Sequence, residues 1–169
     1  METNANLLKI FEYALNQEKT GMSFFQSSLE RMGVGAAVSA FQKLIMEEQR
    51  HIDFISSIIN DLKTGNEIGL GELVPVTIEA TNYFDERSKK EFMEQCVQGS
   101  MVPDVTIFNT AWLIEKDLAE FYARMSEQTS GKVSKALGML SEWEKQHEKF
   151  FKEYRDKLSE VYSQMPWGG

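Results

Sequence analysis

Cysteine and proline are both scarce in this chain of 169 residues, and each shortage excludes a class of protein. The single cysteine, Cys96, has no partner for an intramolecular disulfide and cannot form a Cys-x-x-Cys metal knuckle. Three prolines and eleven glycines are few for an all-β chain, whereas residues that favour helices, such as Glu, Lys, Leu and Met, are plentiful. We therefore expect an all-α protein in a reducing, cytoplasmic setting.

A net positive charge and long apolar runs are also missing. The formal net charge is −8, so no basic surface is available to neutralise the phosphates of a nucleic acid. No apolar run approaches the length of a transmembrane helix, and no basic amphipathic stretch suggests docking on a membrane. The opening residues, METNANLLKIFEYALNQ, lack the charged segment and apolar run of a signal peptide. We expect no nucleic-acid partner and no membrane partner.

Apolar residues recur at helical spacing in four long segments of the chain. The predicted helices cover about residues 4–32, 34–62, 103–127 and 133–162. The intervening stretch of about residues 65–101 holds four glycines and Pro75, and it separates the second helix from the third. A bundle whose second and third helices run parallel needs one long crossover at this point, whereas an up-down-up-down bundle does not. The sequence therefore predicts a single domain over residues 1–169, a four-helix bundle with one long crossover between helices 2 and 3.

Each of the two histidines in the chain has a glutamate three residues before it. The pairs are Glu48 with His51, and Glu144 with His147. On a helix, residues three apart lie on one face, so the two side chains of each pair can reach a common point. Both glutamates fall within the apolar stripe of their predicted helix instead of on the solvated face. Each pair is therefore a candidate for metal ligation.

The other two predicted helices each place one glutamate in the same apolar setting, Glu18 in the first and Glu115 in the third. Four carboxylates in an apolar core cannot stay charged without a partner, and Lys and Arg are absent from these stripes. Two divalent metal ions would balance the four charges. Carboxylate and imidazole ligands without thiolate suit iron or manganese, and zinc and cobalt also fit. We assign Glu48 and Glu144 as bridging ligands, Glu18 and Glu115 as terminal ligands, and one histidine to each metal.

Three aromatic residues lie close to these candidates in the sequence. Tyr122 follows Glu115 by seven residues, so its hydroxyl is a candidate hydrogen-bond or electron donor at the metals, as well as a core residue. Trp112 and Trp143 are predicted to serve only in packing between helices.

The chain resembles the ferritin-like di-iron carboxylate superfamily, and within it the rubrerythrin branch. The resemblance covers all four predicted helices. The residues that carry it are Glu18, the Glu48-x-x-His51 pair, Glu115 and the Glu144-x-x-His147 pair. It implies a centre of two iron ions that reacts with dioxygen or peroxide, commonly in a homodimer or larger assembly.

The sequence departs from the rubrerythrin pattern at two points. Rubrerythrins typically have a further carboxylate one turn after the ligand of the third helix, where this chain has Leu118. They also commonly carry a rubredoxin domain with Cys-x-x-Cys pairs, and this sequence holds no such pair. We therefore expect an external electron donor.

The resemblance favours a di-iron oxidoreductase that reduces peroxide or dioxygen at a buried, carboxylate-bridged site. One alternative keeps the site but makes ferrous iron the substrate, as in a ferroxidase or iron-handling protein. An alternative of another class is a helical scaffold or interaction protein with a relic metal site.

Overall fold

The computed structural model describes residues 3–32, 35–71, 80, 89–91, 93–94, 98 and 101–165, and within the helices it describes no side chain at 36 or 101–104. Four long helices make up most of the described chain: α1 (Asn4–Leu29), α2 (Gly35–Thr64), α4 (Met101–Gln128) and α5 (Gly131–Ser163). The described residues include no β-strand. None of the described helices carries an apolar stretch that could span a lipid bilayer.

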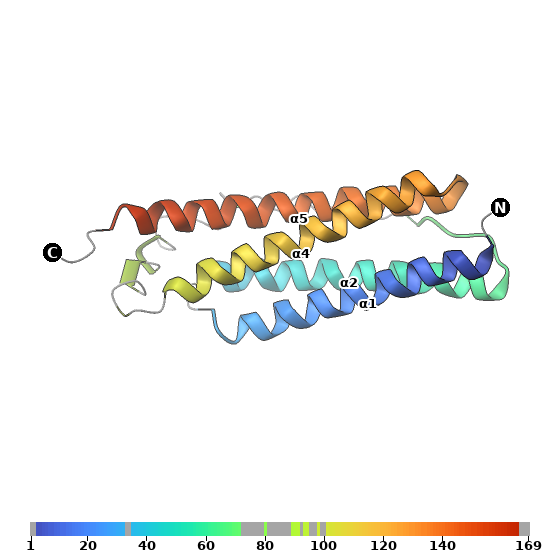
Figure 1. The fold of residues 1–169 in the computed structure, drawn as a ribbon. Helices are drawn as coiled ribbons and strands as arrows, with labels where there is room; N and C mark the ends of the chain where they lie inside the picture. Colours follow the sequence, from blue (N-terminus) through green and yellow to red (C-terminus); the bar gives the residue numbers. More distant parts are fainter. Residues whose placement is uncertain are drawn as a thin grey trace.

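The helices form two antiparallel pairs that pack side by side (Figure 1). Helix α1 runs back along α2, and α4 runs back along α5. Helices α2 and α4 point in the same direction, so the chain must return along the whole bundle between them. This arrangement confirms the predicted all-α, ferritin-like four-helix bundle with one long crossover between its second and third long helices. Most of the crossover lies outside the described residues.

The observed helix ends differ from the predicted ones by a few residues. Helix α1 ends at Leu29, whereas the prediction extends it to about residue 32, and the predicted terminator Gly33 lies outside the described residues. Helix α2 continues to Thr64, and Gly65 follows it with a φ of 72°, a left-handed conformation that glycine adopts without strain. Gly65 therefore ends this helix by the usual mechanism of a C-terminal glycine.

The apolar core of the bundle is divided into two clusters, one toward each end of the helices. One cluster is rich in aromatic rings, and it contains Phe25, Phe41, Phe108, Phe150, Phe151 and Tyr154. The other is mostly aliphatic, and it contains Leu7, Phe11, Ile55, Ile58, Tyr122, Leu137 and Leu140. Burying one such large side chain contributes roughly 1.5–3 kcal/mol. The two clusters can therefore hold together a bundle whose middle is polar.

Candidate metal centre

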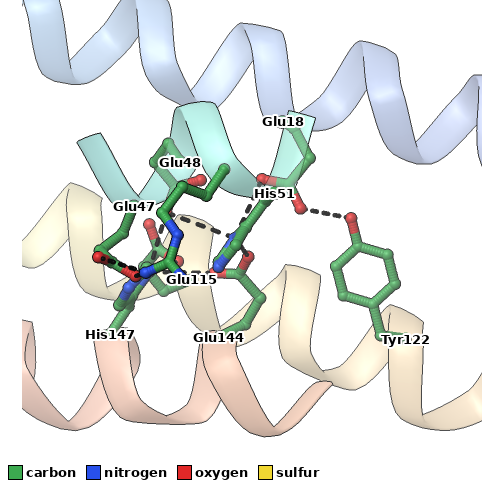
Figure 2. Close-up of polar contacts among 9 residues, drawn as sticks. Glu18, Glu47, Glu48, His51, Glu115, Tyr122, Glu144 and His147 are labelled. Atoms are coloured by element: carbon green, nitrogen blue, oxygen red, sulfur yellow. Dashed lines mark hydrogen bonds and ion pairs between the residues drawn. The ribbon is translucent and has the colours of Figure 1, made fainter. Parts of the chain in front are cut away.

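Between the two apolar clusters, six ionisable side chains from four helices point toward one another (Figure 2). Each is at most 3% exposed. Helix α1 provides one glutamate, α4 provides one, and α2 and α5 each provide a glutamate and a histidine. They are Glu18, Glu48, His51, Glu115, Glu144 and His147. The structure thus brings together all six predicted ligands, although their binding of metal stays a prediction.

His51 faces three of the four carboxylates through its Nδ1 atom. That atom lies 2.7 Å from Oε1 of Glu144, which belongs to the other helix pair. It lies 3.9 Å from Oε1 of Glu48 and also 3.9 Å from Oε2 of Glu18. His51 therefore has one carboxylate from each of three helices around a single nitrogen.

His147 has the mirrored environment. Its Nδ1 atom lies 2.8 Å from Oε1 of Glu48, and 3.5 Å from Oε2 of both Glu115 and Glu144. Glu48 and Glu144 consequently face both imidazoles, whereas Glu115 faces His147. One potential ligand atom from each of Glu48, His51, Glu144 and His147 lies within 4.8 Å of all the others. The geometry defines two half-sites with two shared carboxylates and one further carboxylate each.

Most polar atoms of this cluster have no hydrogen bond from the described protein. Both carboxylate oxygens of Glu48, Glu115 and Glu144 are buried without a hydrogen-bond partner, as are Nδ1 of His51 and Nδ1 of His147. The two closest nitrogen–oxygen pairs join His51 to Glu144 and His147 to Glu48. Both pairs are near enough for hydrogen bonds but do not have hydrogen-bond geometry. Buried polar atoms are rarely left unpaired, so this many in one place fit a set of ligands for metal ions.

No lysine or arginine side chain of the described residues neutralises the cluster. The buried polar residues of the described chain include no lysine or arginine. Arg50, one residue before His51, instead pairs with Glu47 at 3.1 Å near the surface. Burial, and next the negative charges of Glu144 and Glu48, raise the pKa of Glu18 and of Glu115 well above the usual range of a glutamate. Without metal, these two carboxyl groups therefore tend to keep a proton.

The imidazole of His147 and the carboxylate of Glu144 favour their charged forms. Burial acts to lower the pKa of His147, but the neighbouring carboxylates, Glu115 first among them, outweigh it and raise that pKa well above its ordinary value. Burial likewise acts to raise the pKa of Glu144, but the charge of His51 and contacts with its other neighbours hold it well below its ordinary value. Protons thus take part of the role that metal cations would have.

Tyr122 extends the cluster toward the aliphatic half of the core. Its side chain is fully buried, and its hydroxyl donates a hydrogen bond of 2.5 Å to Oε1 of Glu18 (Figure 2). Burial, and next the neighbouring carboxyl group of Glu18, raise the pKa of Tyr122 well above its ordinary value, so the hydroxyl keeps its proton. The sequence places Tyr122 relative to Glu115 on its own helix, but the structure directs its hydroxyl to Glu18 on α1.

Trp143 is a neighbour of the site that sequence analysis treats only as a packing residue. Its ring stacks on His51 with a centroid separation of 5.2 Å and an angle of 19° between the ring planes. Its position directly before Glu144 is the one sequence signal that could have placed it near the ligands. Which face of α5 turns toward His51 depends on helix packing, which that signal does not give.

A helical bundle with one inward glutamate on each of four helices, and a histidine one turn after two of them, is the architecture of di-metal carboxylate proteins. A sequence model of the Rubrerythrin family matches residues 9–155, a range that includes all six residues of the cluster. The chain therefore belongs to the rubrerythrin family, a ferritin-like di-iron family. Comparisons with curated proteins and with solved structures return no match.

The raised pKa values predict that the metal-free protein loses stability as the pH rises. Because Glu18, Glu115 and His147 bind protons more tightly in the folded state, their stabilisation is complete below the unfolded-state pKa values. It is lost as the pH rises through the folded-state values. The pKa of Glu144 is lowered, so its contribution to stability changes with pH in the opposite direction. That change is confined to pH values below about 4.3, outside the range from pH 6 to pH 8. Thermal melts of the metal-free protein should therefore show a lower melting temperature at pH 8 than at pH 6.

The variant Glu115→Gln gives the matched arm of this experiment. Replacing the buried carboxyl by a neutral amide should stabilise the metal-free protein at pH 8 by about 1–3 kcal/mol and flatten the pH dependence. The control is Glu120→Gln on the same helix, where the carboxylate is exposed and lies 3.9 Å from Lys116, so little change is expected. A melting temperature that rises from pH 6 to pH 8 in the metal-free wild type would contradict the assigned protonation.

Proposed function

We propose that this protein is a di-iron oxidoreductase of the rubrerythrin type, which reduces hydrogen peroxide with electrons from an external donor. The observation that carries the proposal is the pair of buried half-sites. Each histidine faces two shared carboxylates, Glu48 and Glu144, and one carboxylate of its own. Membership of the rubrerythrin family supports the same conclusion.

Iron is the metal that we propose for the site. Four carboxylates and two imidazoles form a ligand set of oxygen and nitrogen atoms without thiolate, which suits iron and also admits manganese or zinc. Two divalent ions would bring the four carboxylates to neutrality. When bound, two ferrous ions supply the two electrons that break the O–O bond of peroxide, while the residues of the chain fix their positions.

Tyr122 is the residue that we propose to position Glu18 and to hold a proton at the site. Its hydroxyl already donates to Oε1 of Glu18, which leaves Oε2 of that carboxylate facing the cluster without a hydrogen-bond partner. The raised pKa keeps the phenol protonated, so the donor is retained when the carboxylate is charged. A hydrogen bond of this kind fixes the orientation of a metal-binding carboxylate.

A groove between α1 and α4 offers a small oxidant an approach to the cluster. Its volume is about 360 Å³. Its lining includes Gln17 and Gly21, the residues one before and three after Glu18. It also includes Ile114 and Leu118, which have the same spacing relative to Glu115. The groove is therefore lined by helix neighbours of the two glutamates that we assign as terminal ligands, and Leu118 is part of its wall.

A second candidate function is oxidation of ferrous iron by dioxygen. Leu118 favours it, because this apolar residue, which is 5% exposed, stands where rubrerythrins typically have a further carboxylate. Without that carboxylate, the site has one ligand fewer to exchange between oxidation states. In this alternative, ferrous iron is a substrate that the protein consumes beyond the amount that it binds.

Metal titration tests the proposed occupancy. We expect saturable binding of about two ferrous ions per chain under anaerobic conditions, because four buried carboxylates require roughly four positive charges. The loaded protein should melt at a higher temperature than the metal-free protein, since the ions bind only the assembled site. The measurements are metal analysis after gel filtration and calorimetric melts of both forms.

Two glutamates on α5 provide the controls for this titration. Glu144→Gln should abolish binding of at least one ion, because this carboxylate faces both histidines. Glu142→Gln, two residues earlier on the exposed face, should bind as the wild type does, since its carboxylate pairs with the exposed Lys145 at 2.7 Å and not with the cluster. Equal melting temperatures with and without iron would count against a buried metal centre and favour a helical scaffold with a relic site.

The choice of oxidant separates the two candidate functions. If the protein is a peroxide reductase, its ferrous form should be oxidised much faster by hydrogen peroxide than by dioxygen, and it should turn over with an external donor. If it handles iron, dioxygen should suffice, and ferrous iron should be consumed well beyond two ions per chain. Stopped-flow absorbance with each oxidant measures these rates.

Leu118→Glu is the variant for the same experiment. If the missing carboxylate limits the peroxide reaction, this substitution should accelerate it. Leu113→Glu on the same helix is the control, because Leu113 is 43% exposed and lies outside both core clusters. A faster reaction with dioxygen than with peroxide, unchanged by Leu118→Glu, would leave the peroxidase proposal without support.

A further inference from the structure

Three rings form a stacked column that runs from Trp143 into the candidate metal centre. The indole of Trp143 stacks on the imidazole of His51, with 5.2 Å between centroids and 19° between planes. His51 in turn stacks on His147 at 5.3 Å and 14°. Phe54 packs its edge against the outer ring, with centroids 5.4 Å apart and planes at 69°, which helps to hold Trp143 in place. The column thus contacts one histidine of each half-site.

Trp143 is the end of this column that lies next to exposed residues of its own helix. It is 5% exposed, and the neighbouring residues Glu142 and Lys145 on α5 are exposed. The other oxidisable aromatic residue at the site, Tyr122, is 0% exposed, so a donor at the surface cannot contact it. Of these two residues, Trp143 has the larger exposed fraction, and its ring stacks on a histidine of the cluster.

We propose that Trp143 is the relay through which an external one-electron donor reduces the metal centre, by way of the imidazole of His51. This inference rests on the proposed function, which requires electrons from outside the chain. A donor too large to enter the bundle can approach α5 at the exposed residues Glu142 and Lys145, next to Trp143. The groove that we propose for the oxidant is lined by residues of α1 and α4, so the two reactants would approach at different places on the bundle.

The electron balance of this relay is complete without any lasting change to Trp143. Reduction of one hydrogen peroxide to two water molecules takes two electrons from the centre and two protons from solvent. Two donor molecules restore the centre by giving up one electron each, and each electron passes across the indole and the imidazole. The sum is one peroxide, two reduced donors and two protons converted to two waters and two oxidised donors.

The direct test is the rate at which a one-electron donor reduces the oxidised, iron-loaded protein. With reduced methyl viologen as donor in an anaerobic stopped-flow experiment, Trp143→Leu should slow this reduction about tenfold, which corresponds to about 1.4 kcal/mol in activation free energy. Oxidation of the same variant by peroxide should keep the wild-type rate. Trp143→Phe, which retains a ring against His51, should recover most of the lost rate.

Trp112→Leu is the matched control. Trp112 lies on α4, where it contacts Arg155 with 4.4 Å from the guanidinium carbon to the ring centroid and donates a hydrogen bond to Glu148. It has no ring contact with either histidine among the described pairs. Its removal should leave the reduction rate unchanged.

A second readout does not depend on turnover. Cobalt(II) binding should quench the indole emission of the wild type and of Trp112→Phe, and most of this quenching should disappear in Trp143→Phe. This result would show that Trp143 is the indole coupled to the metal site. Retention of the full quenching in Trp143→Phe would contradict that placement.

The outcomes separate the relay from the proposed function. Reduction of Trp143→Leu at the wild-type rate would overturn the relay, and so would an equal slowing of its reduction and oxidation, which would mark Trp143 as a packing residue. If the wild type binds two ions and accepts electrons through Trp143 but does not consume peroxide, the peroxidase proposal fails and the relay stands. Failure to bind iron at all would overturn both.

Discussion

Four carboxylates are buried in the middle of the helical bundle without a lysine or arginine beside them, and this burial constrains the rest of the structure. Glu18, Glu48, Glu115 and Glu144 are at most 1% exposed, and most of their oxygen atoms have no hydrogen-bond partner. Such an arrangement is unfavourable for the metal-free chain, because a buried charge needs a compensating charge. Protons can compensate in part, as the raised pKa values of Glu18 and Glu115 show. Divalent cations compensate fully, and for this reason the same residues that weaken the empty fold are suited to bind metal.

The fold supplies what this polar layer requires. The aromatic cluster around Phe41 and Phe151 closes one end of the bundle, and the aliphatic cluster around Ile58 and Leu140 closes the other. The two glutamate–histidine pairs lie on α2 and α5, which run in opposite directions in Figure 1. Each histidine then lies closest to the glutamate of the opposite pair, His51 to Glu144 and His147 to Glu48. The site therefore cannot form within one helical hairpin, and its geometry depends on how the two hairpins pack.

The sequence predicts the part of this arrangement that local periodicity controls. Helical spacing of apolar residues identifies the four helices, and the Glu-x-x-His spacing places each pair on one face, so the fold and the family are both predicted correctly. The spacing of residues along one helix does not determine the contacts between helices. The hydrogen bond from Tyr122 to Glu18 joins residues 104 positions apart, and the stacking of Trp143 on His51 depends on the rotation of α5 against α2. Neither contact follows from the spacing of residues along one helix. The sequence alone therefore predicts Tyr122 only as a neighbour of the metals, and it does not predict the contact of Trp143 with His51.

We propose that the six-residue cluster binds two iron ions, with Glu48 and Glu144 shared between them. Anomalous X-ray diffraction from crystals of the iron-loaded protein, recorded on both sides of the iron absorption edge, tests it most directly. We predict two iron peaks between the four helices, one next to His51 and Glu18 and the other next to His147 and Glu115. A single peak, or iron bound only outside the cluster, would contradict the two half-sites on which this interpretation depends.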